Sequence, residues 1–344
     1  MSPKIISVAL DAMSGDHGPQ VTVPAALTIA KEYPNLHLIL VGQTPVLESI
    51  LKIHPDYAAC VERITIQHAS EIVAMDDPPA QAMRNKKDSS MRVMINLVKE
   101  GKAHACVSAG NTGALMATAR FVLKMIPGID RPAICSPLPA MQGRTYILDL
   151  GANVDCTAEH LQQFAIMGSV LASAVTGIVR PRVGLLNIGE EDIKGNEVVK
   201  ETSVLLNKSS LNYIGYVEAN DIFTRKADVV VADGFVGNVL LKTAEGTAKL
   251  MAHFMEAEFK RNLFSKVGAL CALPALRGLK KRMDPRMYNG ASLLGLQGIV
   301  VKSHGGADQV AFAAAIRVAV LEVEHNVLSH IAAGISSASA EPVN

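Results

Sequence analysis

Short β-branched runs alternate with helical patterns along most of this chain, and this alternation limits the folds open to it. The candidate strands are Ile5–Leu10, Leu36–Val41, Ile64–Gln67, Ala103–Ser108, Pro132–Pro137, Thr145–Leu150, Arg182–Asn187, Tyr213–Val217, Asp228–Val231 and Ile299–Val301. The helical segments between them include Pro19–Glu32, Ser89–Glu100, Asn111–Lys124, Ala158–Thr176 and Gly195–Leu206. The strands are apolar throughout, as strands covered on both faces are. We therefore predict an α/β fold with three layers, in which helices cover both faces of a mostly parallel sheet.

The length of 344 residues allows a large core, and 49% of the residues are hydrophobic. We expect one catalytic unit over residues 1–332, in which two lobes without a sharp boundary are compatible with the pattern, and a frayed tail over residues 333–344. The uncharged stretch 161–179 contains glutamines and serines, so a helix buried in protein is expected there rather than a membrane span.

Charge and cysteine content exclude several classes of protein. The net charge of +1 gives no general case for nucleic-acid binding. The five cysteines are an odd number without a Cys-x-x-Cys pair, which argues against a disulfide framework or a zinc ribbon and favours a reducing cytosol. The histidines lack metal-ligand spacing, so we expect no metal.

Polar, glycine-rich segments follow six of the expected strands. They are Asp11–Gly18, Ser108–Gly113, Asp149–Asp155, Asn187–Glu197, Asp233–Asn238 and Ser303–Gly306. Each segment alone is weak evidence, because turns favour Gly, Asn and Asp in any protein. Open parallel sheets bind ligands at the carboxyl ends of their strands. The sequence therefore predicts that these six segments share one edge of the sheet and form a site there.

The segment at 110–113 has the composition of an anion cradle. Gly110, Asn111, Thr112 and Gly113 lie between an apolar strand and an apolar helix, where the first N–H groups of the helix lack internal partners. We expect these four residues to bind phosphate through backbone N–H groups and the Thr112 hydroxyl. An ordinary capped helix is the alternative, and both roles can coexist.

Residues 260–286 are strongly basic and also apolar. They hold eight cations, among them Lys280 and Lys281, and one anion. We predict an amphipathic helical arm over residues 254–286 that Pro274 divides into two short helices. Its apolar contact residues are Leu263, Phe264, Val267 and Leu270. Such an arm can bind an anionic bilayer, grip an acidic protein or pack across a second copy of the chain.

Several familiar chemistries have no motif in this chain. No Gly-x-Gly-x-x-Gly follows the first strand, and no Walker motif, Gly-x-Ser-x-Gly elbow or His-Glu-x-x-His occurs. The remaining inventory is a set of anion cradles, carboxylates, amides, a lysine and a histidine. This inventory suits the attack of inorganic phosphate on an acyl thioester, since phosphate is itself the nucleophile.

Six motifs together show a family resemblance. They are Asp11–Pro19, Ser108–Ala117, Asp149–Asn153, Asn187–Glu191, Lys194–Glu197 and Asp233–Asn238. In order, from about residue 5 to about residue 330, the chain resembles the phosphate acyltransferase family of bacterial phospholipid synthesis.

The resemblance implies a reversible transfer of a long-chain acyl group from acyl-acyl carrier protein to inorganic phosphate. It also implies a homodimer with a fold related to phosphotransacetylase and isocitrate dehydrogenase, and no metal or organic cofactor. Such enzymes lie in the cytoplasm at the inner face of the membrane. They pass acyl phosphate to an integral-membrane glycerol-3-phosphate acyltransferase.

Three side chains are candidates for catalysis, each with a structural alternative. Lys194 is expected to neutralise phosphate or the oxyanion, or else to form an ion pair with a neighbouring glutamate. Asn238 either donates a hydrogen bond to the thioester oxygen or caps the helix that begins near it. His304 either protonates the leaving thiolate, or binds phosphate, or is a buried structural histidine.

Five further polar residues are expected to orient donors rather than to touch the anion, because carboxylates repel phosphate. These residues are Asp11, Asp16, Asp149, Asn153 and Asp233.

Three other functions remain open at this point. A phosphotransacetylase-like enzyme would use a coenzyme A thioester, for which the basic arm has no obvious use. A non-enzymatic membrane adaptor would act through residues 260–286 alone. A dehydrogenase of the isocitrate type would share the fold class, but no nicotinamide motif is evident. Among the uses of the arm, we favour membrane contact.

Overall fold

The sheet has eleven strands in the order β3-β2-β1-β4-β11-β10-β5-β6-β9-β7-β8. The computed structural model describes residues 5–282 and 284–340. In chain order the strands are β1 (Ile6–Asp11), β2 (Leu36–Gly42), β3 (Ile64–His68), β4 (Ala105–Ser108), β5 (Ala133–Pro139), β6 (Arg144–Leu148), β7 (Arg182–Leu186), β8 (Asn212–Val217), β9 (Val229–Val231), β10 (Ala291–Leu294) and β11 (Ile299–Lys302). The prediction of a mostly parallel sheet is confirmed, and β10 is the strand that the sequence pattern missed.

The sheet reverses direction in its middle. Strands β3, β2, β1, β4 and β11 are parallel to one another. β10 pairs antiparallel with both β11 and β5, and β5 pairs antiparallel with β6. β6, β9, β7 and β8 are again mutually parallel. The two parallel sets therefore run in opposite directions, and their carboxyl ends lie at opposite edges of the sheet.

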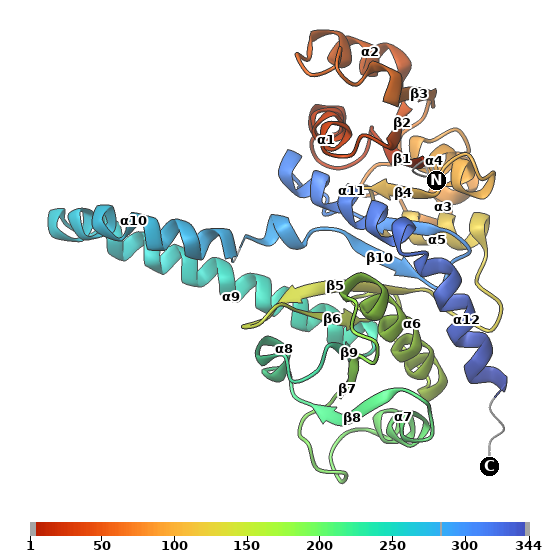
Figure 1. The fold of residues 1–344 in the computed structure, drawn as a ribbon, viewed down its shortest axis with the longest axis vertical. Helices are drawn as coiled ribbons and strands as arrows, with labels where there is room; N and C mark the ends of the chain where they lie inside the picture. The colour runs from red at the N-terminus through yellow and green to blue at the C-terminus, as the bar shows by residue number, and fades with distance from the viewer. Residues whose placement is uncertain (1–4, 283, 341–344) are drawn as a thin grey trace.

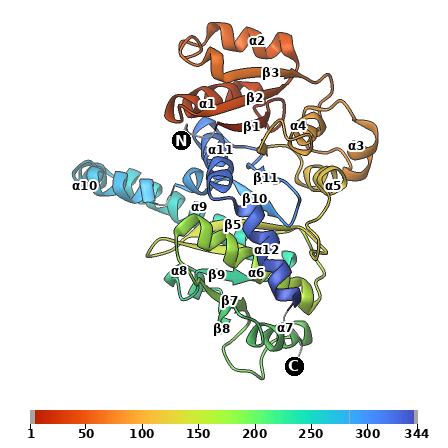
Figure 2. The ribbon, with the colours of Figure 1, turned by 45° about the vertical axis from the view of Figure 1, so that its right-hand side comes forward.

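Helices cover both faces of each half of the sheet (Figures 1 and 2). In the first half, α1 (Pro19–Glu32), α2 (Thr44–Ile53) and α11 (Gln309–Glu324) pack in one core cluster. The second cluster there contains α3 (Pro79–Asn85), α4 (Ser90–Lys99) and α5 (Thr112–Leu123). In the second half, α6 (Ala158–Thr176), α7 (Glu197–Asn207) and α12 (Val327–Ala340) share one cluster. The other cluster contains α8 (Asp221–Thr224) and residues near the start of α9 (Gly234–Lys260).

The uncharged helix α6 lies in the core, where Phe164 is fully buried. Within residues 5–282 and 284–340, no helix combines the length and the apolarity needed to cross a bilayer. This placement agrees with the expectation of a helix buried in protein.

The arm is longer than predicted and consists of two long helices. The 27-residue helix α9 leads into the 20-residue helix α10 (Leu263–Arg282), and the two pack against each other as a hairpin that leaves the body of the protein (Figure 1). The helix pattern thus starts at Gly234 and not near residue 254. The predicted division at Pro274 is wrong, because α10 continues through this residue. A proline removes one N–H group and can be accommodated as a bend.

The predicted frayed tail is also wrong over most of its length. α12 extends to Ala340, and Ile335 is buried in the cluster beneath α6. Residues 341–344 lie outside the described part of the chain. Apolar positions spaced along α12 give it a buried face, which explains why the helix continues past residue 332.

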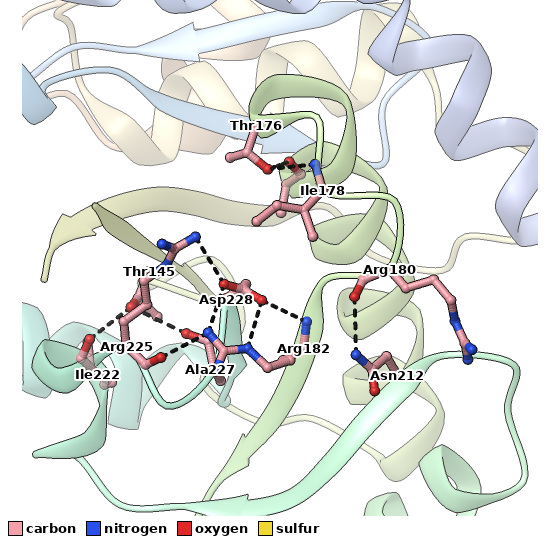
Figure 3. Close-up of polar contacts among 11 residues, drawn as sticks. Thr145, Thr176, Ile178, Arg180, Arg182, Asn212, Ile222, Arg225, Ala227 and Asp228 are labelled. Carbon is pink, nitrogen blue, oxygen red and sulfur yellow. Dashed lines mark hydrogen bonds and ion pairs between the residues drawn. The ribbon is translucent and has the colours of Figure 1, made fainter. Parts of the chain in front are cut away.

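Asp228 links the start of three strands in the second half of the sheet (Figure 3). Its carboxylate accepts hydrogen bonds from the backbone N–H and guanidinium of Arg182, and Arg225 forms a second ion pair at 3.2 Å. The backbone N–H of Tyr146, on β6, donates to the carbonyl of Asp228. Burial raises the pKa of Asp228, but Arg182 and Arg225 outweigh this effect and hold it below its ordinary value.

Replacing Asp228 by Asn should lower the free energy of unfolding by roughly 2–3 kcal/mol at pH 7. This is below the full penalty for breaking a buried pair, since Arg182 is 43% exposed. Because the folded-state pKa is depressed, the wild-type contribution exists above about pH 4 and is lost as the pH falls further. Urea unfolding between pH 3 and pH 7 measures both effects. The exposed pair Lys31–Asp56 offers a matched control, and Asp56→Asn should change the stability little. Equal losses in the two variants would contradict the account.

Candidate functional site

Three loops meet at the carboxyl ends of β1, β4 and β11, which we call the cradle edge. The N–H of Asp16 donates to the carbonyl of Gly305 at 2.9 Å, and the N–H of Ser303 donates to the carbonyl of Ser108 at 2.8 Å. Gly15 has a φ of +83°, and a Cβ there would lie 2.9 Å from the Cβ of Ala109. The loops are therefore packed backbone to backbone.

The start of α5 offers three open N–H groups at this edge. The N–H of Gly110 is turned inward and donates to Ser108 Oγ at 3.0 Å. Asn111 Oδ1 caps the helix by accepting from the N–H of Ala114, while its Nδ2 donates to the carbonyl of Met75. Within the described part of the chain, the N–H groups of Asn111, Thr112 and Gly113 have no hydrogen-bond partner. These three amides and the Thr112 hydroxyl are the donors left for an anion.

A buried carboxyl group supports this loop from below. Asp11 is fully buried, and its Oδ2 accepts a hydrogen bond of 2.8 Å from the hydroxyl of Ser108. Burial raises the pKa of Asp11, and the hydroxyls of Ser90, Ser108 and Ser14 partly offset this rise. Ser108 Oγ also accepts a hydrogen bond from the N–H of Gly110. Asp11 therefore fixes the position of the loop before α5 through Ser108. Asp11 thus positions Ser108, and its role in orienting phosphate donors stays a prediction.

A buried cation that no sequence pattern indicated lies at the cradle edge. Lys302 ends β11 and is only 9% exposed, with its Nζ donating to the carbonyls of Ala109 and Ser303. Burial lowers the pKa of Lys302 to about 8, although the negative charges of Asp11 and Asp16 oppose the shift. The available signal was a lysine that directly follows an apolar strand and precedes Ser303-His304-Gly305.

His304 is exposed at the same edge, so the expectation of a buried structural histidine is wrong. Its Nδ1 accepts a hydrogen bond from the N–H of Gly306 at 3.0 Å, and its own N–H donates to Asn289 Oδ1. The neutral ring therefore carries its proton on Nε2, which is free to act on a ligand. Asp16 is exposed beside it, since a Cβ on Gly306 would lie 3.2 Å from Asp16 Oδ2.

A second group of predicted residues lies at the carboxyl ends of β6, β9 and β7, which we call the opposite edge. The Asp149 carboxylate accepts hydrogen bonds from the N–H groups of Ile134, Ala152 and Asn153 and from Asn153 Nδ2. Burial raises the pKa of Asp149, and these donors partly offset the rise. Asp149 and Asn153 thus shape the loop that follows β6.

The start of α9 packs directly on that loop. Asp233 is the N-cap, and its Oδ1 accepts from the N–H of Val236 at 2.8 Å. A Cβ on Gly237 would lie 1.9 Å from the carbonyl oxygen of Asp149, so only glycine fits there. Asn238 lies one turn inside the helix and does not cap it, because α9 begins at Gly234. Its exposed side chain faces Gly151.

Lys194 lies in the exposed loop after β7 and has the ion pair that was its structural alternative. Its Nζ is 2.9 Å from Glu191 Oε2, and this contact raises the pKa of Lys194. The neighbouring Glu190 pairs with Lys226 instead. A cation paired in this way is held charged, but it is not aimed at the cradle edge.

The prediction that all six polar segments share one edge is wrong. Asp11, Asp16, Gly110–Gly113 and His304 lie at the cradle edge, whereas the residues of 149–153, 233–238 and Lys194 lie at the opposite edge. Four strand spacings separate β4 from β6, which is about 19 Å along the sheet. The physical reason is the antiparallel pairing of β10, β5 and β6. In the described part of the chain, no group of three or more His, Cys, Asp or Glu side chains is placed to hold a metal ion.

Gly237→Ala should lower the free energy of unfolding by about 3 kcal/mol or more, because the new methyl group forces α9 away from Asp149. Gly246→Ala is the matched control on the same helix, since its Cβ would meet nothing within 4 Å. The control should be stabilising by roughly 0.5–1 kcal/mol. Thermal unfolding of both variants checks the contact, and a tolerated alanine at position 237 would refute it.

The fold is similar to that of phosphotransacetylases. Superposition on a phosphotransacetylase from Streptococcus pyogenes covers 94% of this chain and 95% of that protein, with a TM-score of 0.62 and 17% sequence identity. The similarity to the EutD phosphotransacetylase from Staphylococcus aureus has a TM-score of 0.59 at 14% identity and covers 92% and 94% of the two chains. At these identities the likeness shows the fold alone.

The sequence comparisons are closer. The model of a family described as fatty acid synthesis protein matches residues 6–330. The chain is 62% identical over 322 residues to a phosphate acyltransferase from Alkalilimnicola ehrlichii, which covers 94% of both chains. It is 58% identical over 326 residues to one from Legionella pneumophila, which covers 94% of this chain and 95% of the relative. The resemblance found in the sequence is thus confirmed, and the chain belongs to the phosphate acyltransferase family of acyl-transferring enzymes.

Proposed function

We propose that this enzyme transfers a long-chain acyl group from acyl-acyl carrier protein to inorganic phosphate, reversibly, to supply acyl phosphate for phosphatidic acid synthesis. The relatives named phosphate acyltransferase support acyl transfer to phosphate. The observation that carries the proposal is the set of three unpartnered N–H groups at the start of α5, with the buried Lys302 beside the same loop. Together they provide donors and a positive charge for one phosphate ion.

In the proposed reaction, the bound phosphate is the nucleophile. A phosphate oxygen attacks the thioester carbonyl carbon, a C–O bond forms, and the C–S bond breaks to release the thiolate of the carrier protein. The thiolate takes up one proton. The bound hydrogenphosphate ion supplies this proton, and His304 is placed to donate a hydrogen bond from its Nε2–H to the departing sulfur, because its Nδ1 accepts from the N–H of Gly306. The amides of α5 hold the attacking ion in line.

Lys194 and Asn238 are proposed to contact phosphate or the thioester oxygen, although they lie away from the cradle edge. Both lie at the carboxyl ends of strands that run opposite to β4, and among the described residues neither side chain has a hydrogen bond or ion pair with residues 111–113. Their proposed contact with phosphate or with the thioester oxygen therefore depends on a substrate that spans the two edges, within one chain or between two copies. The proposed homodimer is supported by the exposed apolar side chains of α9, including Leu250, Met251 and Phe254, which one chain leaves uncovered.

The arm fits the proposed association with the inner face of the cytoplasmic membrane. Leu263, Phe264, Val267 and Leu270 are all exposed on α10, and Phe264 is 88% exposed. Apolar side chains interleaved with cations favour an anionic bilayer surface. The side chains of Lys280 and Lys281 lie outside the described part of the structure. An enzyme at this position would deliver acyl phosphate to the integral-membrane glycerol-3-phosphate acyltransferase.

A coenzyme A thioester is the second candidate acyl donor, since the neighbours in fold are phosphotransacetylases. The direct test incubates the pure protein with inorganic phosphate and either acyl-acyl carrier protein or acyl-coenzyme A, and measures acyl phosphate. We expect faster formation from the carrier-protein thioester. Preference for coenzyme A would support the second candidate, and no acyl phosphate from either donor would favour a non-enzymatic adaptor.

Thr112→Val should raise the KM for phosphate about tenfold, because valine keeps the shape but removes the hydroxyl donor to a charged ligand. Thr112→Ser is the control and should retain a KM near that of the wild type. Initial rates at varied phosphate concentration measure both values. An unchanged KM in the valine variant would remove Thr112 from the proposed site.

Lys302 makes phosphate binding depend on pH. Because the pKa of Lys302 is about 8, the free enzyme loses this charge as the pH rises above 8, and the KM for phosphate should then increase by up to about tenfold per pH unit. Lys302→Met should raise the KM at pH 7 by about tenfold or more and abolish the further increase. A variant with the wild-type pH profile would contradict the assignment.

Leu270→Glu should release the protein from anionic vesicles and leave turnover in solution intact, because a carboxylate on the apolar side of the arm opposes insertion. Ile53→Glu is the matched control, since Ile53 is also exposed (83%, against 70% for Leu270) but lies at the end of α2, in the body of the protein. Vesicle flotation measures binding. Retained binding by the Leu270 variant, or equal loss in both variants, would contradict membrane contact through α10.

A further inference from the structure

We infer that the outer surface of α4 and α5 is the docking surface for the acidic carrier protein, separate from the arm. This inference rests on the proposed function, because it assigns a surface to the proposed acyl donor. We define the α4–α5 face by the residues Arg92, Lys99, Arg120, Phe121 and Lys124. In Figures 1 and 2 the helices α3, α4 and α5 lie on the other side of the molecule from α10.

The α4–α5 face is basic without compensating charge. The three helices α3, α4 and α5 contain no Asp or Glu. Within the described part of the chain, none of the four cations of the face has a carboxylate within 4.0 Å. Other cations of this region, Lys86 and Lys102, are paired with Asp77 and Glu100. The face therefore has a net charge of +4 available to an anionic partner.

An exposed aromatic side chain lies between two of these charges. Phe121 is 52% exposed, and its ring has the guanidinium of Arg92 at 5.1 Å and the ammonium of Lys124 at 5.0 Å. These contacts hold both cations in place around an apolar centre. Arginine and aromatic residues are the side chains most enriched at protein interfaces.

The geometry of α5 connects this face to the phosphate cradle. Thr112 and Phe121 are nine residues apart, which is about 14 Å along the helix axis. Gly113 and Ala117 form a strip of small residues on the same side of α5 as Lys124, and at Gly113 this strip borders α3, where a Cβ would lie 2.7 Å from Pro79 Cγ. A carrier protein seated on the face could lay its flexible thioester arm along this strip toward the bound phosphate.

A protein partner fits this face better than a bilayer does. Phe121 is the one large apolar residue of α3, α4 and α5 that is prominently exposed among the described residues, whereas α10 exposes at least four. One aromatic ring gives little area for insertion into a membrane, and the discrete cations instead match the carboxylates of an acidic helix. In this proposal the α4–α5 face binds the carrier protein, and α10 binds the membrane.

The test compares two double variants with the same change in charge. Arg92→Glu/Arg120→Glu reverses two cations of the face. Lys200→Glu/Lys208→Glu reverses one cation of α7 and one at its C-cap, in the other half of the protein. We expect the first variant to raise the KM for acyl-acyl carrier protein at least tenfold. Its KM for phosphate, and its turnover of an acyl-pantetheine thioester, should stay within twofold of the wild type. The control variant should resemble the wild type in all three measurements.

Other outcomes overturn the inference. A similar rise in KM in the control variant would indicate a general effect of net charge. An unchanged KM in the face variant, or a tenfold rise instead in Lys266→Glu on α10, would place the carrier protein elsewhere. Loss of vesicle binding by the face variant would assign the face to the membrane and not to the carrier protein. Calorimetric titration with the carrier protein measures binding to the surface independently of acyl phosphate formation. If the wild type binds it without forming acyl phosphate and the face variant does not bind it, the proposed function fails while the docking surface stands.

Discussion

The antiparallel pairing of β10, β5 and β6 is the constraint on which the placement of every candidate residue depends. It joins two parallel sets of strands that run in opposite directions, so their carboxyl ends form two separate edges. One edge has the open amides of α5, Lys302 and His304, and the other has Asp149, Asn153 and the start of α9.

The cradle edge is organised by buried polar groups rather than by exposed ones. Asp11 supports Ser108, Ser108 holds the N–H of Gly110, and Asn111 both caps α5 and ties it to Met75. With the N–H groups of Gly110 and Ala114 satisfied internally, the amides of residues 111–113 remain open, which is the condition for binding an anion without rearrangement. Lys302 contributes a charge whose hydration has already been lost, so its attraction for phosphate is strong at short range.

Local features were predictable from the sequence, and the strand direction was not. Apolar runs located ten strands, and the glycine-rich segments located the loops that end them. β10 was missed because Ala291–Leu294 is short and follows the basic arm. Without β10, nothing indicated that the sheet reverses, and Lys194 and Asn238 were therefore placed beside Thr112. Lys302 was missed because one lysine at a strand end has no pattern of its own; its burial depends on the packing of three loops. The length of α10 was missed because a proline inside a helix is disfavoured, yet α10 continues through Pro274.

The most direct test of the account is the location of bound phosphate. A crystal grown or soaked in millimolar inorganic phosphate should show the ion against the N–H groups of Asn111, Thr112 and Gly113, with the Lys302 ammonium turned toward it. The same crystal form of Thr112→Val should show reduced occupancy. Phosphate bound instead at the opposite edge beside Lys194, or amides of α5 that remain unoccupied in the wild type, would contradict the central claim.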